Sequence, residues 1–283
     1  MKTIVWKSIM IIVLILVMFG MGYGLEVLNQ SAYDPELKIA FLGTYDEADC
    51  IVLWQKDFAV MIDTGEERDE AGILEFLNEN GIKQLDYLIL THPDKDHIGS
   101  AAAITYALNV KKVIEPFYKK ENSRYKQLQA RFAQHQVKVI TPRNNLQYTI
   151  NDINIYIYPP KEKYYEADNN YSLAVYIKHR DKSMLFCGDA ENERVAELME
   201  INLGTIDLYK LPNHGRYSEN SEELLGRLHP QYTVVSSQRA SQRMTARGDK
   251  CETNWFYTVK NTAVFVSDGN EIKVMDHKEE VMK

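Results

Sequence analysis

Short apolar runs recur along most of this chain, and each is followed by polar or turn-forming residues. Runs that alternate or stay apolar predict β-strands, and apolar residues three or four apart predict helices. Strands are expected over residues 37–42, 50–54, 58–62, 85–90, 113–114, 137–140, 153–158, 172–178, 184–187, 208–211, 233–236, 264–267 and 272–275. Helices are expected over residues 73–80, 101–108, 118–134, 191–200 and 221–228.

The order of these elements indicates an architecture. Strands come first in pairs, then helices intervene, and a hairpin over Asp268-Gly269-Asn270 closes the chain. Such an order suits two sheets packed together with helices outside, an α/β layered domain. No break divides residues 37–276, so a single domain is expected there.

The first two dozen residues differ from the rest. No residue from Ser8 to Leu25 is charged, and Ile9 to Phe19 is entirely apolar. An uncharged stretch of about 18 residues reaches the length of a helix that spans a bilayer. The pattern therefore predicts a transmembrane anchor within residues 1–25, a polar linker over 26–36 and a folded domain over 37–283.

The charges beside this segment predict its orientation. Lys2 and Lys7 precede it, and Glu26 is the first charge after it. The positive-inside bias then places the N-terminus in the cytoplasm and the folded domain outside, in a single-pass membrane protein. The alternative is a cleaved signal peptide and a secreted protein, because Gly22 and Gly24 offer small residues at a cleavage site.

Composition narrows the possible partners. The net charge of −7 argues against a purely electrostatic grip on nucleic acid by the whole surface. Cys50, Cys187 and Cys251 are too few and too widely spaced for a disulfide framework or a zinc knuckle. Nothing in the sequence indicates a protein partner.

The segment from Thr91 to Gly99 is rich in groups that bind metal ions. Within six residues it holds His92, Asp94, Asp96 and His97, directly after a predicted strand. A loop there can turn these side chains toward one point, and imidazole nitrogen with carboxylate oxygen suits zinc or manganese. The alternative is a polar turn that merely follows a strand.

Two further strand ends carry the same kind of residue. Asp189 follows the predicted strand over 184–187, and His214 follows the strand over 208–211. A glycine stands beside each of them, which lets the chain turn. The remaining histidines have no such setting. Asp189 and His214 therefore join the candidate metal ligands.

Taken in order, these motifs resemble the metallo-β-lactamase superfamily, and within it the soluble domain of ComEC-type DNA-internalisation proteins. The matching segments are Asp63-Thr64-Gly65, His92-Pro93-Asp94-Lys95-Asp96-His97, Asn169-Asn170-Tyr171-Ser172-Leu173, Gly188-Asp189-Ala190-Glu191 and His214-Gly215. The resemblance covers about residues 37–236. It implies an αββα sandwich and a metal-dependent hydrolase.

This chain also departs from the family pattern. Asp94 replaces the usual second histidine, and Asn213 replaces the first histidine of a pair. The loop that normally supplies a third histidine offers residues 168–170, and a basic loop over 239–250 replaces a Gly-His-Pro segment. The sequence shows no counterpart of the channel-forming helices of that family, so it is not expected to act as a DNA transporter by itself.

The resemblance implies two metal sites of unequal strength. The firmer one draws on Asp96, His97, Asp189 and His214. The weaker one draws on His92, Asp94 and a residue from 168–170, with Asp189 bridging both. Oxygen ligands make harder cations more competitive, so one firm and one labile divalent ion, zinc or manganese, are expected.

Roles for individual residues follow from this arrangement. Asp96 is expected to hold the metal and accept the proton of the attacking water. Asp63 is expected to orient a metal-binding imidazole, or to be a simple turn aspartate. Lys210 and Asn170 are expected to contact substrate, or to cap strand ends.

The substrate remains open between classes. Residues 118–132 interleave basic with aromatic side chains, which could follow single-stranded DNA, although a solvated amphipathic helix has the same composition. The first interpretation is an extracytoplasmic phosphodiesterase or nuclease that acts on DNA. The alternatives are a hydrolase of a small ester, thioester or lactam, and a degenerate domain that binds metal or DNA without catalysis.

Overall fold

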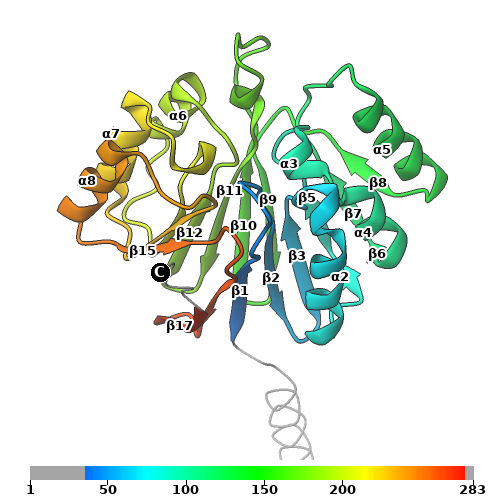
Figure 1. Cartoon of the computed structure of the whole chain (residues 1–283), viewed down its shortest axis with the longest axis horizontal. Helices are drawn as coiled ribbons and strands as arrows, with labels where there is room; N and C mark the ends of the chain where they lie inside the picture. Colours follow the sequence, from blue (N-terminus) through cyan, green and yellow to red (C-terminus); the bar gives the residue numbers. More distant parts are fainter. Residues whose placement is uncertain (1–35, 278–283) are drawn as a thin grey trace, which may run out of the picture. The chain divides into compact units, whose positions relative to one another are not determined.

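Two β-sheets pack face to face, and helices cover the outer face of each (Figure 1). The computed structural model describes residues 36–277. The strands of the first sheet are β1 (Leu37–Phe41), β2 (Ile51–Gln55), β3 (Phe58–Ile62), β5 (Tyr87–Ile89), β7 (Lys112–Ile114), β8 (Lys138–Ile140), β16 (Ala263–Ser267) and β17 (Ile272–His277). Those of the second are β9 (Leu146–Ile150), β10 (Ile153–Tyr158), β11 (Ala174–His179), β12 (Lys182–Phe186), β13 (Leu208–Lys210), β14 (Tyr232–Val235) and β15 (Asn254–Tyr257).

The first sheet has the order β17-β16-β1-β2-β3-β5-β7-β8, and the second has the order β15-β14-β13-β12-β11-β10-β9. The short strands β4 (Gln84–Leu85) and β6 (Asn109–Val110) pair with each other. Parallel pairing joins β3 to β5 and β12 to β13. This pairing matters for function, because the carboxyl ends of parallel strands meet at one edge of a sheet.

Each sheet has its own set of helices. The first sheet carries α2 (Glu70–Glu79), α3 (Lys95–Ile98), α4 (Ala101–Ala107) and α5 (Ser123–Gln134). The second carries α6 (Asn192–Met199), α7 (Glu219–Leu228) and α8 (Gln242–Lys250). Short 3₁₀ turns are η1 (Glu67–Asp69), η2 (Asp168–Tyr171) and η3 (Asn213–Gly215).

The core has three layers that follow from side-chain alternation along the strands. In β1, Leu37 and Ile39 point between the sheets, whereas Ala40 points toward the helices of the first sheet. All five residues of β3 are buried, because it is covered on both faces. The expected αββα layering is therefore confirmed for the described residues.

Most differences from the predicted elements concern edges and caps. Strands β9 and β15, at the two edges of the second sheet, were not predicted, because half-exposed edge strands have a weak apolar pattern. Helix α5 begins at Ser123 rather than residue 118, since the Asn122 side chain accepts a hydrogen bond from the Tyr125 amide (2.8 Å). The basic loop expected over 239–250 is wrong in most of its length, because Ser241 caps helix α8 there.

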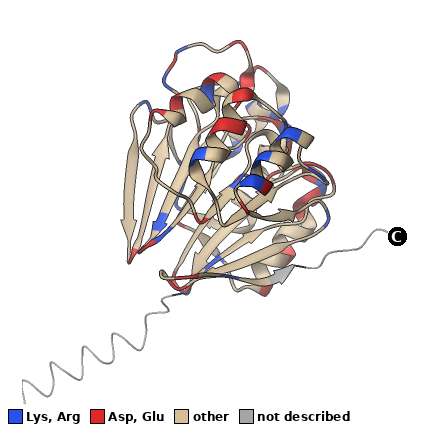
Figure 2. Cartoon of the chain, turned by 90° about the vertical axis from the view of Figure 1, so that its left-hand side faces the viewer, with Lys and Arg blue, Asp and Glu red and all other residues tan. Residues whose placement is uncertain are grey.

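The predicted anchor over 1–25 and the linker up to residue 35 lie outside the described residues. Within residues 36–277, no helix has the length and apolar character needed to cross a bilayer. Acidic and basic residues are interspersed over the helices and loops that face the viewer, while the strands in this view carry few of either (Figure 2).

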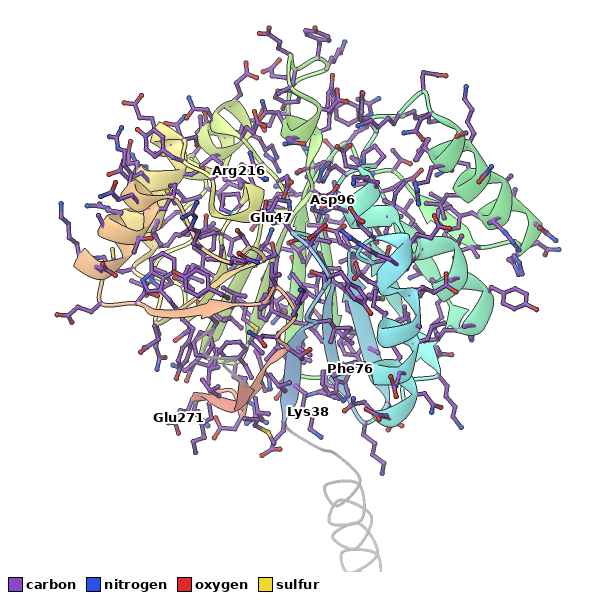
Figure 3. All side chains as sticks on the ribbon, viewed as in Figure 1. Lys38, Glu47, Phe76, Asp96, Arg216 and Glu271 are labelled. Atoms are coloured by element: carbon purple, nitrogen blue, oxygen red, sulfur yellow. The ribbon has the colours of Figure 1, made fainter. Side chains whose placement is uncertain are left out.

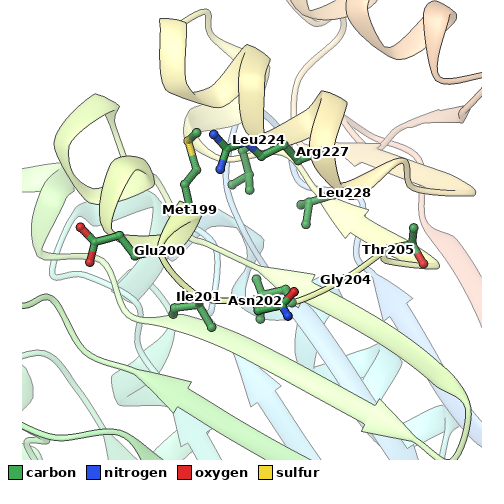
Figure 4. Close-up of a pocket in the computed structure, with 10 residues that line it drawn as sticks. Met199, Glu200, Ile201, Asn202, Gly204, Thr205, Leu224, Arg227 and Leu228 are labelled. Atoms are coloured by element: carbon green, nitrogen blue, oxygen red, sulfur yellow. The ribbon is translucent and has the colours of Figure 1, made fainter.

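A cavity of about 430 Å³ lies between the loop after α6 and helix α7 (Figure 4). Met199, Ile201, Leu224 and Leu228 supply apolar walls, and Arg227 lies at its border. None of the side chains that line it is among the candidate ligands. The chemistry expected from the sequence lies elsewhere, at one end of the sheets.

Candidate metal centre

The loops that follow four strands meet at one end of the sandwich. Asp63 directly follows β3, and His92 comes shortly after β5. Asp189 and His214 follow β12 and β13 in the other sheet. Asp96, on the short helix α3, lies at this end, opposite the end that carries Lys38 and Glu271 (Figure 3).

Backbone hydrogen bonds join these loops. The Thr64 amide donates to the His97 carbonyl (2.7 Å), and the Asn213 amide donates to the Gly188 carbonyl (3.2 Å). Each bond connects residues that follow different strands, so the loops hold one another in place. These backbone bonds therefore fix the positions of the loops that carry the candidate ligands.

Four candidate ligands face a common point. The ligand atoms of Asp96, His97, Asp189 and His214 all lie within 4.8 Å of one another. His214 Nε2 lies 2.9 Å from Asp189 Oδ2 and 3.4 Å from Asp96 Oδ2. His97 Nε2 lies 3.4 Å and 3.6 Å from the same two oxygens. Tetrahedral ligands about 2.1 Å from a zinc ion are about 3.4 Å apart, so the set fits a divalent cation.

Unused polar atoms at this point support the same fit. His92 Nε2, His97 Nε2 and Asp189 Oδ1 are buried and find no hydrogen-bond partner among the described residues. Buried polar atoms are nearly always satisfied, so an unsatisfied group of them points to an ion or a ligand. Zinc and manganese would both accept these nitrogen and oxygen atoms.

Asp63 fixes the orientation of the His97 ring. Its Oδ2 accepts a hydrogen bond from His97 Nδ1 at 2.8 Å, and the Thr91 amide and hydroxyl donate to the same carboxylate at 2.7 and 2.6 Å. Because Nδ1 is held by Asp63, Nε2 faces the cluster, where a bound cation would displace its proton. Asp63 therefore lies where it can orient a metal-binding imidazole, as the sequence predicted.

His214 is oriented by a longer relay. Its Nδ1 donates to Ser236 Oγ (3.0 Å), and Ser236 donates to Asp49 Oδ1 (2.5 Å). The other Asp49 oxygen forms an ion pair with Lys210, whose Nζ lies 3.8 Å from Asp189 Oδ1. Lys210 is 1% exposed, so its ammonium lies on the buried side of the cluster, away from solvent.

Sequence reasoning missed Asp49 and Ser236. Asp49 precedes a strand rather than following one, and Ser236 closes a strand without any ligand-type spacing. The sole sequence signal for Asp49 was a carboxylate directly before the apolar run that starts at Cys50. Asp49 takes part in the site because the fold buries it beside Lys210 and Ser236, which are distant from it in the sequence.

The electrostatics favour a bound cation. Burial opposes protonation of His97, but the carboxylates of Asp189 and Asp63 outweigh it and raise the pKa of His97 well above its usual value. Burial likewise opposes protonation of His214, but Asp189 raises its pKa to about 9. In the absence of a metal, protons thus compensate the surplus of carboxylates, and a divalent cation would compete for the same position.

His92 has the opposite character. Burial and the neighbouring His97 lower its pKa to about 4, although Asp189 and Asp94 oppose the fall. The ring centroids of His92 and His97 are 4.0 Å apart. His92 is therefore a neutral imidazole beside the four-ligand set and not one of its members.

The residues expected for the weaker metal site lie near one another, but several of them are engaged by other side chains. Asp94 is paired with Lys120 at 2.5 Å. The Asn170 side chain donates to Glu193 (2.9 Å) and accepts from the Arg194 amide (3.2 Å), so it holds the start of α6. The substrate contact predicted for Asn170 finds no support in these bonds.

The basic and aromatic stretch is an amphipathic helix, as the alternative interpretation held. Tyr125 and Phe132 of α5 are buried. Arg124 pairs with Glu67 at 3.1 Å, and Lys126 pairs with Glu121 at 2.9 Å. These two rings are therefore not available to stack on bases.

The sequence model of the metallo-beta-lactamase superfamily matches residues 43–238. The chain belongs to this superfamily. Its sequence is also 31% identical over 171 residues to ComE operon protein 3 of Bacillus subtilis (strain 168), a match covering 59% of this chain and 22% of that protein. It is 29% identical over 170 residues to Recombination protein 2 of Haemophilus influenzae, covering 60% and 20%. The resemblance to ComEC-type proteins is thereby confirmed, over about a fifth of the length of these relatives.

Solved structures agree on the fold. The metallo-beta-lactamase fold protein YhfI from Bacillus subtilis superposes with a TM-score of 0.57 at 12% identity, covering 82% of this chain and 100% of that one. Igni18, a metallo hydrolase from Ignicoccus hospitalis, gives 0.51 at 15% identity, covering 86% and 100%. At such identities the likeness shows the architecture alone.

Proposed function

We propose that this protein is a divalent-metal-dependent phosphodiesterase that cleaves single-stranded DNA and acts outside the cytoplasmic membrane. The observation that carries the catalytic part is that the ligand atoms of Asp96, His97, Asp189 and His214 all lie within 4.8 Å of one another. The substrate class is supported by the resemblance to ComEC-type DNA-internalisation proteins and by a relative named as a recombination protein. The location is supported by the uncharged segment over residues 8–25 and its flanking lysines.

The four ligands differ in exposure, which gives the site a direction. The Asp96 side chain is 21% exposed, whereas Asp189 is 6% exposed and His97 is fully buried. Substrate and water therefore approach from the Asp96 side. A divalent cation held by these residues supplies Lewis acidity and lowers the pKa of nearby water.

Asp96 accepts a proton in the proposed reaction, and Asp63 and Ser236 position the two imidazoles. Asp96 is the ligand that solvent reaches, so its carboxylate is placed to accept a proton from an incoming water molecule. Burial raises the pKa of Asp96, but His214 and His97 outweigh it and lower the pKa, which keeps the carboxylate ionised. Asp63 and Ser236 hold the two imidazoles so that neither ring needs to reorient during the reaction.

The test uses the full chain, purified in a mild detergent and freed of metal. Hydrolysis of end-labelled single-stranded DNA and of bis(p-nitrophenyl) phosphate is measured with manganese, zinc or magnesium. Both phosphodiesters should be cleaved, with manganese more effective than zinc. Asp96→Asn should reduce turnover by a factor of about 100 or more, because it removes a ligand and the proton acceptor.

The same assay separates the other candidate functions. Cleavage of p-nitrophenyl acetate or nitrocefin without cleavage of either phosphodiester would assign the site to small esters or lactams. Metal binding without hydrolysis of any substrate would mean a degenerate, non-catalytic domain. Full activity of Asp96→Asn would leave the phosphodiesterase standing but remove the role given to Asp96.

A further inference from the structure

Lys120, in the loop between β7 and α5, lies among residues that the family pattern assigns to a second metal ion. Its Nζ is 2.5 Å from Asp94 Oδ1 and 3.4 Å from Asp168 Oδ2. Asp94 belongs to the predicted weaker ligand set, and Asp168 to the loop from which a third ligand was expected. One ammonium therefore lies between the two carboxylates and forms an ion pair with each.

We propose that the Lys120 ammonium takes the place of the second metal ion, so that the protein binds one divalent cation per chain. The inference rests on the proposed function, since it takes the four-ligand set as the site of the first cation. It replaces the labile second ion that the sequence predicts. A lysine has three N–H donors, so two can serve Asp94 and Asp168 while the third remains for a substrate oxygen.

The other groups of the weaker set are engaged as well. The Asn169 side-chain amide donates to Glu191 (2.9 Å), and the Asn170 amide donates to Glu193. With Asp94 paired to Lys120, His92 and the bridging Asp189 are what remains for a second ion. Two protein ligands fall short of the three or four that zinc sites use.

The surroundings of Lys120 hold its loop in position. Tyr118 stacks on Tyr171, with ring centroids 4.3 Å apart and an interplanar angle of 15°. Tyr171 ends the 3₁₀ turn that carries Asp168. The stacked pair thus connects the loop of Lys120 to the loop of its carboxylate partner. The Lys120 side chain is 29% exposed, so it is not sealed from solvent.

Metal stoichiometry tests this proposal without any assay of activity. The metal-free full chain is loaded with excess manganese and desalted, and bound manganese per chain is measured by mass spectrometry and by calorimetric titration. We expect one ion in the parent protein. Lys120→Ala frees Asp94 and Asp168 beside His92 and Asp189, so we expect two ions in that variant.

Two matched variants serve as controls. Lys119→Ala removes the neighbouring exposed lysine and should stay at one ion. Lys120→Arg retains the positive charge and should also stay at one. Thermal unfolding curves of all variants establish that the fold is intact, and the count in the parent protein stands whether or not Lys120→Ala folds.

The outcomes separate the two proposals. Two ions in the parent protein, or one ion in a folded Lys120→Ala, would overturn the role of Lys120 and leave the proposed function standing. No ion in the parent protein would overturn the proposed function itself, and with it this inference.

Discussion

Lys210→Met should lower the free energy of unfolding by about 3 to 5 kcal/mol, the usual cost of leaving one partner of a buried ion pair alone. Lys210 and Asp49 are each 1% exposed in the side chain. Burial favours the neutral amine, but the Asp49 carboxylate outweighs it and raises the pKa of Lys210, so the pair is charged. Methionine fills nearly the same volume without the charge. The variant would therefore leave a buried carboxylate with Ser236 as its remaining close hydrogen-bond donor.

A double variant separates the lost charge from the lost packing. Asp49→Asn with Lys210→Met removes both charges and keeps an oxygen that can accept from Ser236. It should be more stable than Lys210→Met alone, because no unpaired buried charge remains. The measurement is urea unfolding of the full chain, followed by circular dichroism with a chelator present so that metal binding adds nothing.

Lys111→Met is the matched control for an exposed pair. Lys111 lies 2.7 Å from Asp86 but is 50% exposed, so solvent screens the interaction and its loss should cost less than about 1 kcal/mol. Equal costs for Lys210→Met and Lys111→Met would refute the reasoning, because burial would then make no difference. A double variant less stable than Lys210→Met would refute the assignment of the cost to the unpaired carboxylate.

Three further predictions concern other parts of the chain. Gly188→Ala should lower the free energy of unfolding by about 2 kcal/mol or more and weaken manganese binding, since at φ +52° the new Cβ would lie 2.6 Å from the Thr91 hydroxyl. Gly204→Ala, at φ +68° with open space around it, should show the effect of backbone strain alone when unfolding and manganese binding are measured in the same way. Burial raises the pKa of Glu115, so the parent protein should lose more stability than Glu115→Gln as pH rises above about 4.5; equal pH dependence of the two proteins in urea unfolding would contradict this. Protease added to intact cells should digest the folded domain, and protection until lysis would reverse the predicted topology.

Most of the fold could be predicted because burial on two faces leaves a strong pattern. Strands β3 and β10 occupy the residues that their apolar pattern indicates. The edge strand β9 could not, since it alternates between half-buried and exposed residues, and β15 is only four residues long with one buried side chain. Helix α8 could not be predicted from an apolar pattern, because it is short and strongly charged. Its first turn depends on a single serine cap.

The four-ligand set could be predicted for a different reason. His97, Asp189 and His214 each follow an apolar strand, and parallel pairing within each sheet brings such strand ends to one edge. The groups that orient these ligands have no comparable signature. Ser236 reaches Asp49 from 187 residues along the chain, and Lys210 reaches it from 161. Only the packing of the two sheets makes such contacts.

Asp94 shows how far a local motif can determine chemistry. The spacing of Asp94 from His92 indicates a metal ligand. Whether Asp94 binds a metal ion or an ammonium group depends on which side chains from other parts of the chain lie beside it. Lys120, 26 residues further along the chain, forms an ion pair with Asp94, whereas Asp189 of the four-ligand set lies 3.8 Å from the ammonium of Lys210. The charge balance around each carboxylate, rather than the spacing of the motif, then decides how many ions the site takes.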